Sequence, residues 1–232
     1  MSLARNDPAQ YDQLADQWWV PAGGFAMLHW LAGSRAEHIP PAPSSDAVLV
    51  DLACGGGLMA PHVQRLGYRH VGVDLGAAGL ALAHEHGVGA VRGSVLAVPL
   101  ADGCADVVVC GEILEHVEDD VAVLAECARL LKPGGVLVVD AIADSWLAAP
   151  VAVGIAERIP GGPPPGIHDP ALFVDRRRLL AAADRLGLDL RLVGLRPSVR
   201  DLVAWKRGRR DTVRMVSMPW SGILFAGYGR KR

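Results

Sequence analysis

The sequence has 232 residues, of which 51% are hydrophobic and 21% are charged, and its formal net charge at pH 7 is −2. This composition excludes a chain too polar to build a core, and the near-neutral charge gives no indication of a nucleic-acid partner. The N-terminal run MSLARNDPAQ has no apolar signal segment, and charged residues and a proline interrupt the most apolar stretch, residues 136–156, so we expect a cytoplasmic protein.

The first segment of the chain is rich in tryptophan and then in proline. Trp18 and Trp19 lie within residues 11–35, and the run PPAPSS at residues 40–45 has the composition of a linker. We therefore expect residues 1–45 to form an N-terminal helical cap with a linker.

From residue 46 onward, short apolar runs alternate with longer helix-like segments. This alternation is typical of a parallel sheet that is covered by helices on both faces. The pattern predicts strands at 47–52, 70–74, 89–92, 105–110 and 135–140, with helices at 58–66, 77–86 and 119–131.

A long loop rich in proline and glycine, IPGGPPPG at residues 159–166, interrupts this pattern. Long loops in compact domains are often lids or binding segments, so we expect a lid or substrate insert near residues 145–170. After it the sequence predicts a helix at 175–186 and strands at 188–195 and 222–228. The expected fold is α/β: a doubly wound Rossmann-like sheet, mostly parallel with one antiparallel C-terminal strand, and helices on both faces.

A glycine-rich loop follows the first predicted strand. Gly55 and Gly57 stand where that strand passes into a helix, so the backbone can take positive φ values and the helix can present free N–H groups to a ligand. Asp74 ends the second strand about twenty residues later, where a carboxylate can accept hydrogen bonds from ribose hydroxyls. The pattern indicates a cofactor that contains a nucleoside.

The identity of that cofactor depends on the charge beside the loop. Gly55, Gly57 and Ala60 also satisfy the GxGxxG/A pattern of dinucleotide-binding proteins, and glycines alone can simply make a tight turn from strand to helix. Asp51, however, would repel a pyrophosphate and attract the sulfonium and ammonium groups of S-adenosylmethionine. Its position favours S-adenosylmethionine.

Glu112, Glu115 and His116 follow the fourth predicted strand at spacings of i, i+3 and i+4. On a helical turn all three would point to one side, at the edge where parallel strands place their ligand sites. Such a set could hold Mg²⁺ or another divalent cation, with open positions left for water and substrate oxygens. His116 could instead act as a general base without a metal, and the acidic turn could merely complement the helix dipole.

Taken together, these motifs resemble the class I S-adenosylmethionine-dependent methyltransferases. The resemblance rests on DLACGGG at 51–57, Asp74, VPLADGCADVVV at 98–109 and LKPGG at 131–135. More narrowly, Trp18-Trp19, Gly24-Phe25, Leu28-His29, EILEH at 112–116 and GIHD at 166–169 are similar to the ubiquinone-biosynthesis O-methyltransferase subfamily. The resemblance implies that residues 46–232 form the S-adenosylmethionine-binding methyltransferase domain.

The resemblance also implies which residues bind S-adenosylmethionine: Arg35, Asp51, Ala53, Gly55, Gly57, Asp74, Leu75, Ser94, Val95 and Gly111. In this set the glycine loop would hold the methionine part, Asp74 the ribose and Leu75 the adenine. Two positions depart from the family pattern, because Ala53 replaces the usual first glycine and Ser94 stands where many members carry an acid.

The same resemblance implies a catalytic and a metal-binding set. It assigns Glu112, Glu115 and His116 as ligands of a magnesium-type ion, and it indicates Glu112, His116 and His168 as catalytic or pocket residues. From the residues alone, Asp169, which follows His168, could orient that imidazole, although a single His-Asp pair usually makes only a loop hydrogen bond.

We therefore expect an S-adenosylmethionine-dependent O-methyltransferase that acts on a small phenolic or catechol-like hydroxyl, with or without a divalent cation. Three alternatives stay open: a methyltransferase with an amine or carbon acceptor, a nicotinamide-dependent oxidoreductase, and a cofactor-binding protein without turnover. The expected partner is the small aromatic substrate, with no nucleic acid. In the subfamily the apolar segment at 146–159 is associated with lipids, which suggests peripheral membrane contact, and the sequence does not indicate an oligomeric state.

Overall fold

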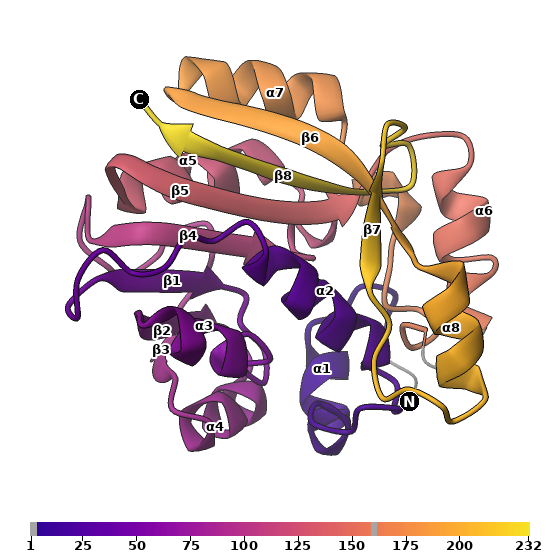
Figure 1. Ribbon diagram of the computed structural model, residues 1–232. Helices are drawn as coiled ribbons and strands as arrows, with labels where there is room; N and C mark the ends of the chain where they lie inside the picture. The colour runs from indigo at the N-terminus through magenta and orange to yellow at the C-terminus, as the bar shows by residue number, and fades with distance from the viewer. Residues whose placement is uncertain (1–3, 159–161) are drawn as a thin grey trace.

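The computed structural model describes residues 4–158 and 162–232. Within these residues the chain forms one eight-stranded sheet in the order β3-β2-β1-β4-β5-β8-β6-β7 (Figure 1). The strands are β1 Val48–Leu52, β2 Arg69–Asp74, β3 Gly89–Arg92, β4 Ala105–Gly111, β5 Leu131–Ile142, β6 Leu188–Pro197, β7 Met215–Met218 and β8 Leu224–Lys231. Each strand predicted from the sequence is present.

The sheet is mostly parallel, as the alternating pattern predicts. β1 pairs in parallel with β2 and β4, β2 with β3, and β4 with β5. β8 runs antiparallel to both β5 and β6, which confirms the expected antiparallel C-terminal strand. β7 is a second antiparallel strand, paired with β6, that the sequence did not predict. The expected fold class is confirmed.

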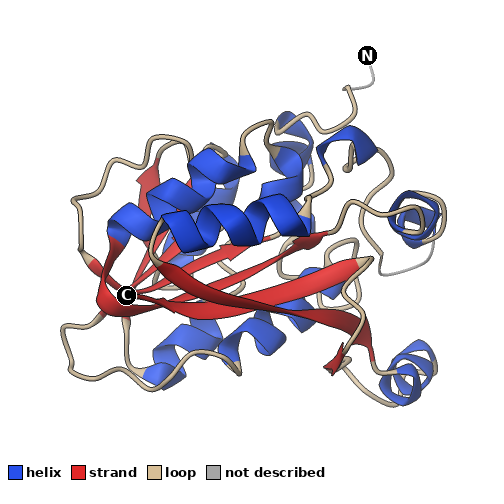
Figure 2. Ribbon diagram, turned by 90° about the horizontal axis from the view of Figure 1, so that it is seen from above, coloured by secondary structure: helices blue, strands red, loops and turns tan. Residues whose placement is uncertain are grey.

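Helices lie on both faces of the sheet, as Figure 2 shows from above. The α-helices are α1 Ala9–Gln13, α2 Ala26–Ala36, α3 Ala60–Leu66, α4 Ala77–Glu85, α5 Asp120–Leu130, α6 Ala148–Ala152, α7 Arg176–Arg185 and α8 Val199–Lys206. Short 3-10 helices are η1 Ala15–Gln17, η2 Leu114–His116, η3 Ala156–Arg158 and η4 Pro170–Leu172. Among the α-helices, α6 and α8 had no counterpart in the sequence prediction.

Strand β4 shows how the two faces are filled. Its residues alternate between the faces because successive side chains of a strand point in opposite directions. Val108 and Cys110 pack in the cluster that contains residues of α5 and α7, whereas Val107 and Val109 pack with residues of α2 and α3. All four side chains are buried, which explains why β4 reads as a continuous apolar run.

The N-terminal cap shares the core of the larger domain. Trp18 and Phe25 are buried in the same cluster as Leu49 of β1 and Val107 of β4. Their rings stack with centroids 4.5 Å apart. The residues before β1 are therefore held against the sheet, where they can reach the carboxyl ends of its strands.

The segment between β5 and α7 forms short helices around the expected insert. It contains α6, η3 and η4, while residues 159–161 of the Pro/Gly loop lie outside the described residues. Trp146 is 82% exposed. None of the described helices combines the length and the hydropathy that crossing a bilayer would demand.

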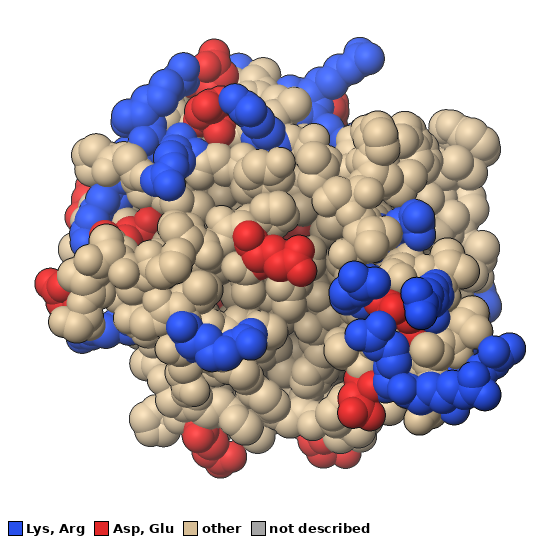
Figure 3. Space-filling model, in the orientation of Figure 1, with Lys and Arg blue, Asp and Glu red and all other residues tan. Residues whose placement is uncertain are grey.

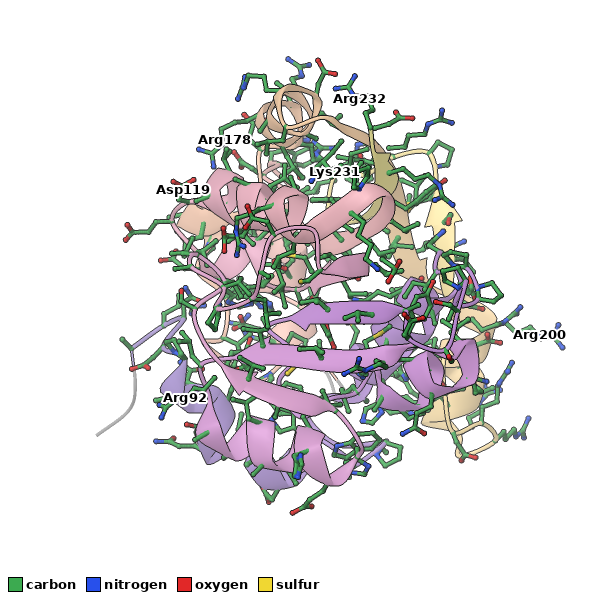
Figure 4. All side chains as sticks on the ribbon, turned by 90° about the vertical axis from the view of Figure 1, so that its left-hand side faces the viewer. Arg92, Asp119, Arg178, Arg200, Lys231 and Arg232 are labelled. Carbon is green, nitrogen blue, oxygen red and sulfur yellow. The ribbon has the colours of Figure 1, made fainter. Side chains whose placement is uncertain are left out.

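Charged side chains lie mainly at the periphery. Arg210 and Arg214 both donate to the buried Asp201 of α8, at 2.7 and 2.8 Å, and Figure 3 shows basic side chains gathered on that side of the molecule. The labelled Arg92 and Arg200 point outward in Figure 4, away from the sheet.

Candidate active site

A cavity of about 400 Å³ lies at the carboxyl ends of β1, β2 and β4. Such an edge is where open α/β sheets bind ligands, and the volume lies in the range of small-molecule sites, about 300–1,000 Å³. The predicted site residues that line it are Arg35, Asp51, Ala53, Gly55, Asp74, Leu75, Ser94, Val95, Gly111, Glu112 and His116. Gly57, Glu115 and His168 do not line it.

The glycine loop after β1 forms one wall of the cavity beneath Trp18. Gly55 has a φ of 49°, and a Cβ at this position would overlap the Trp18 indole. A Cβ at Gly56 would lie 2.7 Å from Trp18 Cγ. The absence of side chains therefore lets a tryptophan from the cap lie directly on the loop. Gly57 serves a different purpose, because a Cβ there would meet Ala83 of α4.

Asp74 connects the glycine loop to the end of β2. Its Oδ2 accepts a hydrogen bond from the Gly55 N–H at 2.9 Å, and its Oδ1 accepts one from the Gly76 N–H at 2.8 Å. Desolvation raises the pKa of this carboxyl, although the two backbone hydrogen bonds counteract the rise. Each carboxylate oxygen keeps a second lone pair, so both can accept a hydroxyl of a ligand in the cavity.

Arg35 of α2 reaches the end of β4 through the protein interior. Its guanidinium lies against Gly111, where a Cβ would overlap it, and donates two hydrogen bonds to Asp140 of β5. Both charged side chains are buried. Asp140 Oδ1 also accepts the Glu112 N–H at 3.0 Å. Asp140 thus fixes both Arg35 and the turn after β4.

The turn after β4 does not place the two glutamates on one side, so the predicted helical arrangement is wrong. Glu112 has a left-handed backbone with a φ of 51°, and the helix that follows is only the 3-10 turn η2. Glu112 lines the cavity, and its buried Oε1 has no hydrogen-bond partner among the described residues. Glu115 is fully buried behind the turn, where its Oε1 accepts the Ile142 N–H at 3.1 Å.

This arrangement does not fit a divalent cation held by Glu112, Glu115 and His116. Within residues 4–158 and 162–232, no group of three or more histidine, cysteine, aspartate or glutamate side chains has the geometry to hold a metal ion. Glu115 faces β5 while Glu112 faces the cavity, and Asn6 engages one ring nitrogen of His116. The predicted metal ligands are therefore neighbours in sequence that the fold does not bring together as a ligand set.

The carboxyl groups of Glu112 and Glu115 stay protonated at pH values at which exposed glutamates are ionised. Desolvation, together with the charges of Glu115 and Asp140, raises the pKa of Glu112 well above its ordinary value. Desolvation also raises the pKa of Glu115 to about 8, with the charge of Asp140 adding to the effect. Both carboxyls are thus neutral over much of the range in which exposed glutamates are ionised.

His116 presents its imidazole at the cavity wall. Its Nε2 lies 3.4 Å from the Tyr11 hydroxyl, and both residues line the cavity. Desolvation lowers the pKa of His116 to about 3, and nearby His168 adds to the decrease. The ring is therefore neutral at physiological pH, and one of its two nitrogens carries no hydrogen.

His168 lies behind His116 and not at the cavity. The two rings stack with centroids 5.3 Å apart. The partner of its Nδ1 is Glu157, at 3.2 Å, and not the adjacent Asp169, which accepts the Ala171 N–H at the start of η4. Asp169 therefore makes a loop hydrogen bond, the more usual role of such a pair, and does not orient this imidazole.

The structure adds wall residues that sequence reasoning missed. Asn6, Tyr11 and Asp12 reach the cavity from the cap. No local sequence motif predicts this position, because the residues that they contact lie far away in the sequence. Asp140 had a visible signal, a charged residue inside an apolar strand, but its partner Arg35 is 105 positions away. Of the described residues of the segment, 145–158 and 162–170, none lines the cavity, so its role as a substrate cap stays a prediction.

Known proteins resemble this chain in sequence and in fold. Residues 50–139 match the family model described as a methyltransferase domain. The chain is 35% identical to the ubiquinone biosynthesis O-methyltransferase of Ralstonia nicotianae, over 81% of its own length and 84% of that protein. It is 36% identical to the protein of the same name from Cupriavidus pinatubonensis, over 79% of its own length and 78% of that protein.

Among solved structures, the fold is similar to that of a SAM-dependent methyltransferase from Thermotoga maritima, described as a possible histamine N-methyltransferase. The TM-score is 0.68, and the match covers 96% of this chain and 98% of the other at 18% sequence identity. At this identity the likeness concerns the fold alone, so the acceptor has to be inferred from the site.

Proposed function

Since this chain belongs to the S-adenosylmethionine-dependent methyltransferases, in the family of the ubiquinone biosynthesis O-methyltransferases, we propose that it methylates the hydroxyl oxygen of a small phenol or catechol. The observation that carries the proposal is the position of the His116 imidazole at the wall of the cavity formed by the glycine loop, Asp74 and Gly111. The names of the curated relatives support oxygen as the acceptor atom.

S-adenosylmethionine supplies a methyl group on a positively charged sulfur and leaves as S-adenosylhomocysteine. We assign Asp74 to the ribose hydroxyls, because its two oxygens retain free lone pairs at the cavity. Leu75, Ser94 and Val95 would contact the adenine. The residues assigned to the methionine part are Arg35, Asp51, Ala53, Gly55 and Gly111, with Gly57 supporting the loop from behind.

The negative charges around the glycine loop suit a cationic ligand. Asp51 is buried near the end of β1 and lines the cavity. A carboxylate in a partly desolvated wall attracts an ammonium or sulfonium group more strongly than it would in water. The same charge would oppose a pyrophosphate. Family membership and this charge together decide against the nicotinamide-dependent alternative.

His116 is proposed to take the proton of the acceptor hydroxyl. As the oxygen forms its bond to the methyl carbon, the carbon–sulfur bond breaks and its electron pair stays on sulfur. The O–H proton passes to Nε2 of His116, which later releases it to solvent. A phenol has a pKa of about 10, as tyrosine does, so removal of this proton is the step that a base assists.

Glu112 is proposed to orient the acceptor. Its unpartnered Oε1 can accept a hydrogen bond from a substrate hydroxyl inside the cavity. In a catechol, one hydroxyl could hydrogen-bond to His116 and the other to the Glu112 carboxyl. Holding the reacting oxygen in line with the methyl group is the larger part of what such a site contributes.

The proposed reaction uses no step through a metal ion. The geometry of Glu112, Glu115 and His116 does not form a ligand set, so a divalent cation stays a prediction without support from the described residues. The proposal therefore expects full activity after treatment with a chelator. Loss of activity on chelation, restored by added magnesium, would contradict this proposal and favour the metal-assisted mechanism.

The acceptor class can be tested with labelled S-adenosylmethionine. We expect transfer of the labelled methyl group to phenols and catechols, and none to matched amines or to carbon nucleophiles. Transfer to an amine or a carbon atom would overturn the assignment of oxygen. Failure of every acceptor, with S-adenosylmethionine still bound, would favour a cofactor-binding protein without turnover.

Peripheral membrane contact stays a prediction. It has one feature in its favour, the exposed Trp146 at the start of the segment that contains α6. Tryptophan is enriched at membrane interfaces because its ring is apolar and its N–H is polar. Co-sedimentation with liposomes that is lost in Trp146→Ser would support contact through this segment, and absence of sedimentation would remove the prediction.

A further inference from the structure

Asn6, from the cap, makes two hydrogen bonds with His116, which lies 110 positions later in the chain. Its Nδ2 donates to the backbone carbonyl of His116 at 3.1 Å, and its Oδ1 lies 2.5 Å from Nδ1 of the ring. Asn6 lines the same cavity as His116. No other described side chain contacts both the backbone and the ring of His116 by hydrogen bonds.

The carbonyl of His116 decides how the Asn6 amide is oriented. A carbonyl oxygen can only accept a hydrogen bond, so the NH₂ group of Asn6 must face it. The amide oxygen then faces the imidazole, and because that oxygen can only accept, Nδ1 of His116 must carry a hydrogen. In a neutral imidazole the other nitrogen, Nε2, is then bare.

The other neighbours of the ring are consistent with this tautomer and do not impose it. The Tyr11 hydroxyl beside Nε2 can either donate or accept, so by itself it leaves the tautomer open. Desolvation raises the pKa of Tyr11, which keeps its proton available for donation to a bare Nε2. His168 uses its Nδ1 for Glu157 and only stacks on His116.

Asn6 is itself held in place. Its backbone N–H donates to the Gly166 carbonyl at 3.0 Å, and its φ of 59° is a left-handed conformation that asparagine tolerates better than most residues. Gln10 of α1 strengthens the same attachment by donating to the carbonyl of Gly166 at 3.3 Å, without contacting His116. The start of the chain is thus attached to the Gly166 carbonyl by two hydrogen bonds.

We propose that Asn6 is a positioning residue that fixes the Nδ1–H tautomer of His116 and so keeps the Nε2 lone pair at the cavity wall. The inference rests on the proposed function in one respect, that Nε2 is the nitrogen which accepts the proton of the substrate. A partner of this kind sets which ring nitrogen is free, as the outer neighbours of ligating and catalytic histidines do.

The tautomer can be read directly by long-range ¹H–¹⁵N correlation spectroscopy of the ¹⁵N-labelled full chain, with His116 assigned from the signal that His116→Gln removes. We expect Nδ1–H in the wild type. Asn6→Leu, which has no hydrogen-bonding side chain, should shift His116 to Nε2–H or to a mixture. Asn6→Asp retains an acceptor for Nδ1–H and should preserve the wild-type tautomer.

Gln10→Leu is the matched control, because it loosens the cap without touching the ring, and it should also keep Nδ1–H. Nε2–H in the wild type, or an unchanged His116 signal in Asn6→Leu, would overturn the proposal. If Asn6→Leu fails to fold, the wild-type and Asn6→Asp spectra still decide the matter, because loss of Nδ1–H in either one contradicts the assignment.

Turnover provides a second readout that distinguishes this proposal from the proposed function. With a catechol acceptor, Asn6→Leu should lower kcat by about 10- to 100-fold, the usual effect of removing such a partner, while Asn6→Asp recovers part of the loss. Wild-type protein that methylates no phenol would contradict the proposed function alone. The spectra would still decide the role of Asn6, since they require no acceptor.

Discussion

The guanidinium of Arg35 and the carboxylate of Asp140 are joined inside the protein by two hydrogen bonds, Nε to Oδ2 at 2.5 Å and Nη2 to Oδ1 at 2.7 Å. The pair connects α2 of the cap to β5 in the middle of the sheet, and its Arg35 side chain lies against Gly111 at the cavity wall. Two opposite charges removed from water stabilise each other only while both are present.

Removing the charge of Asp140 should therefore destabilise the fold strongly. Asp140→Asn leaves Arg35 buried without a counter-charge, and we expect a loss of about 3–5 kcal/mol in the free energy of unfolding. Asp184→Asn is the control, because the ion pair between Asp184 and Arg232 is exposed and should cost at most about 1 kcal/mol. Denaturant titration of both variants measures the difference, and equal losses would contradict the structural role of the buried pair.

Alanine substitutions at Gly55 and Gly134 should distinguish the stability cost of a strained backbone from the cost of overpacking. Gly55 and Gly134 both have positive φ values, 49° and 76°, but only a side chain at Gly55 would overlap Trp18. Alanine should cost about 1–2 kcal/mol at Gly134, from its left-handed backbone alone. At Gly55 overpacking should add about 1–3 kcal/mol. The comparison uses thermal or denaturant unfolding, and similar losses at the two positions would show that Trp18 does not lie on the loop.

Asp74 should be required for binding the cofactor. Asp74→Asn removes the charge that accepts the ribose hydroxyls and weakens the link to the Gly55 N–H. Hydrogen bonds to charged groups are worth about 1.5–3 kcal/mol, so the Kd for S-adenosylmethionine should rise by about 10- to 100-fold. Calorimetry would measure this, with Asp102→Asn in an exposed loop as the control. A Kd that stays at the wild-type value would remove the ribose assignment.

Glu115 predicts how stability depends on pH. The folded protein retains the proton of Glu115 until its pKa of about 8, whereas the unfolded chain releases it near the ordinary value of 4.5. Between these values the folded state binds more protons, so this contribution to stability is full below 4.5 and is lost as the pH rises through 8.

Glu115→Gln cannot ionise, and its amide oxygen can still accept the Ile142 N–H. Its free energy of unfolding should therefore fall less than that of the wild type between pH 6.5 and 8. Unfolding curves across this window provide the measurement, with Glu118→Gln at an exposed position as the control. A wild-type slope in Glu115→Gln would mean that the buried carboxyl is ionised in the folded protein.

The sheet was predictable because burial on both faces makes its parallel strands continuous apolar runs, as in β4. β7 escaped prediction because it has four residues and only part of it is buried, so no periodicity stands out. α8 lies in a stretch whose many arginines obscure its apolar positions.

The site residues that could be predicted are those whose role depends only on the local sequence around them. Gly55 and Asp74 are of this kind, since Gly55 follows one recognisable apolar strand and Asp74 ends the next. Asn6 and Asp140 were not, because their roles arise from contacts with His116 and Arg35 more than 100 residues away. The spacing of Glu112, Glu115 and His116 predicted a helical turn with all three side chains on one side, and this prediction was wrong. The backbone of Glu112 is left-handed and a 3-10 turn follows it, in place of a regular α-helix.

The most direct measurement is transfer of the labelled methyl group from S-adenosylmethionine to a catechol by the wild type and by His116→Gln, with the Kd for S-adenosylmethionine measured on the same samples and His84→Gln as the control. The account predicts a labelled methyl ether from the wild type and from the control, with kcat lower by about 10²- to 10⁴-fold in His116→Gln and the Kd unchanged. Undiminished transfer by His116→Gln, or a label found on nitrogen or carbon, would contradict it.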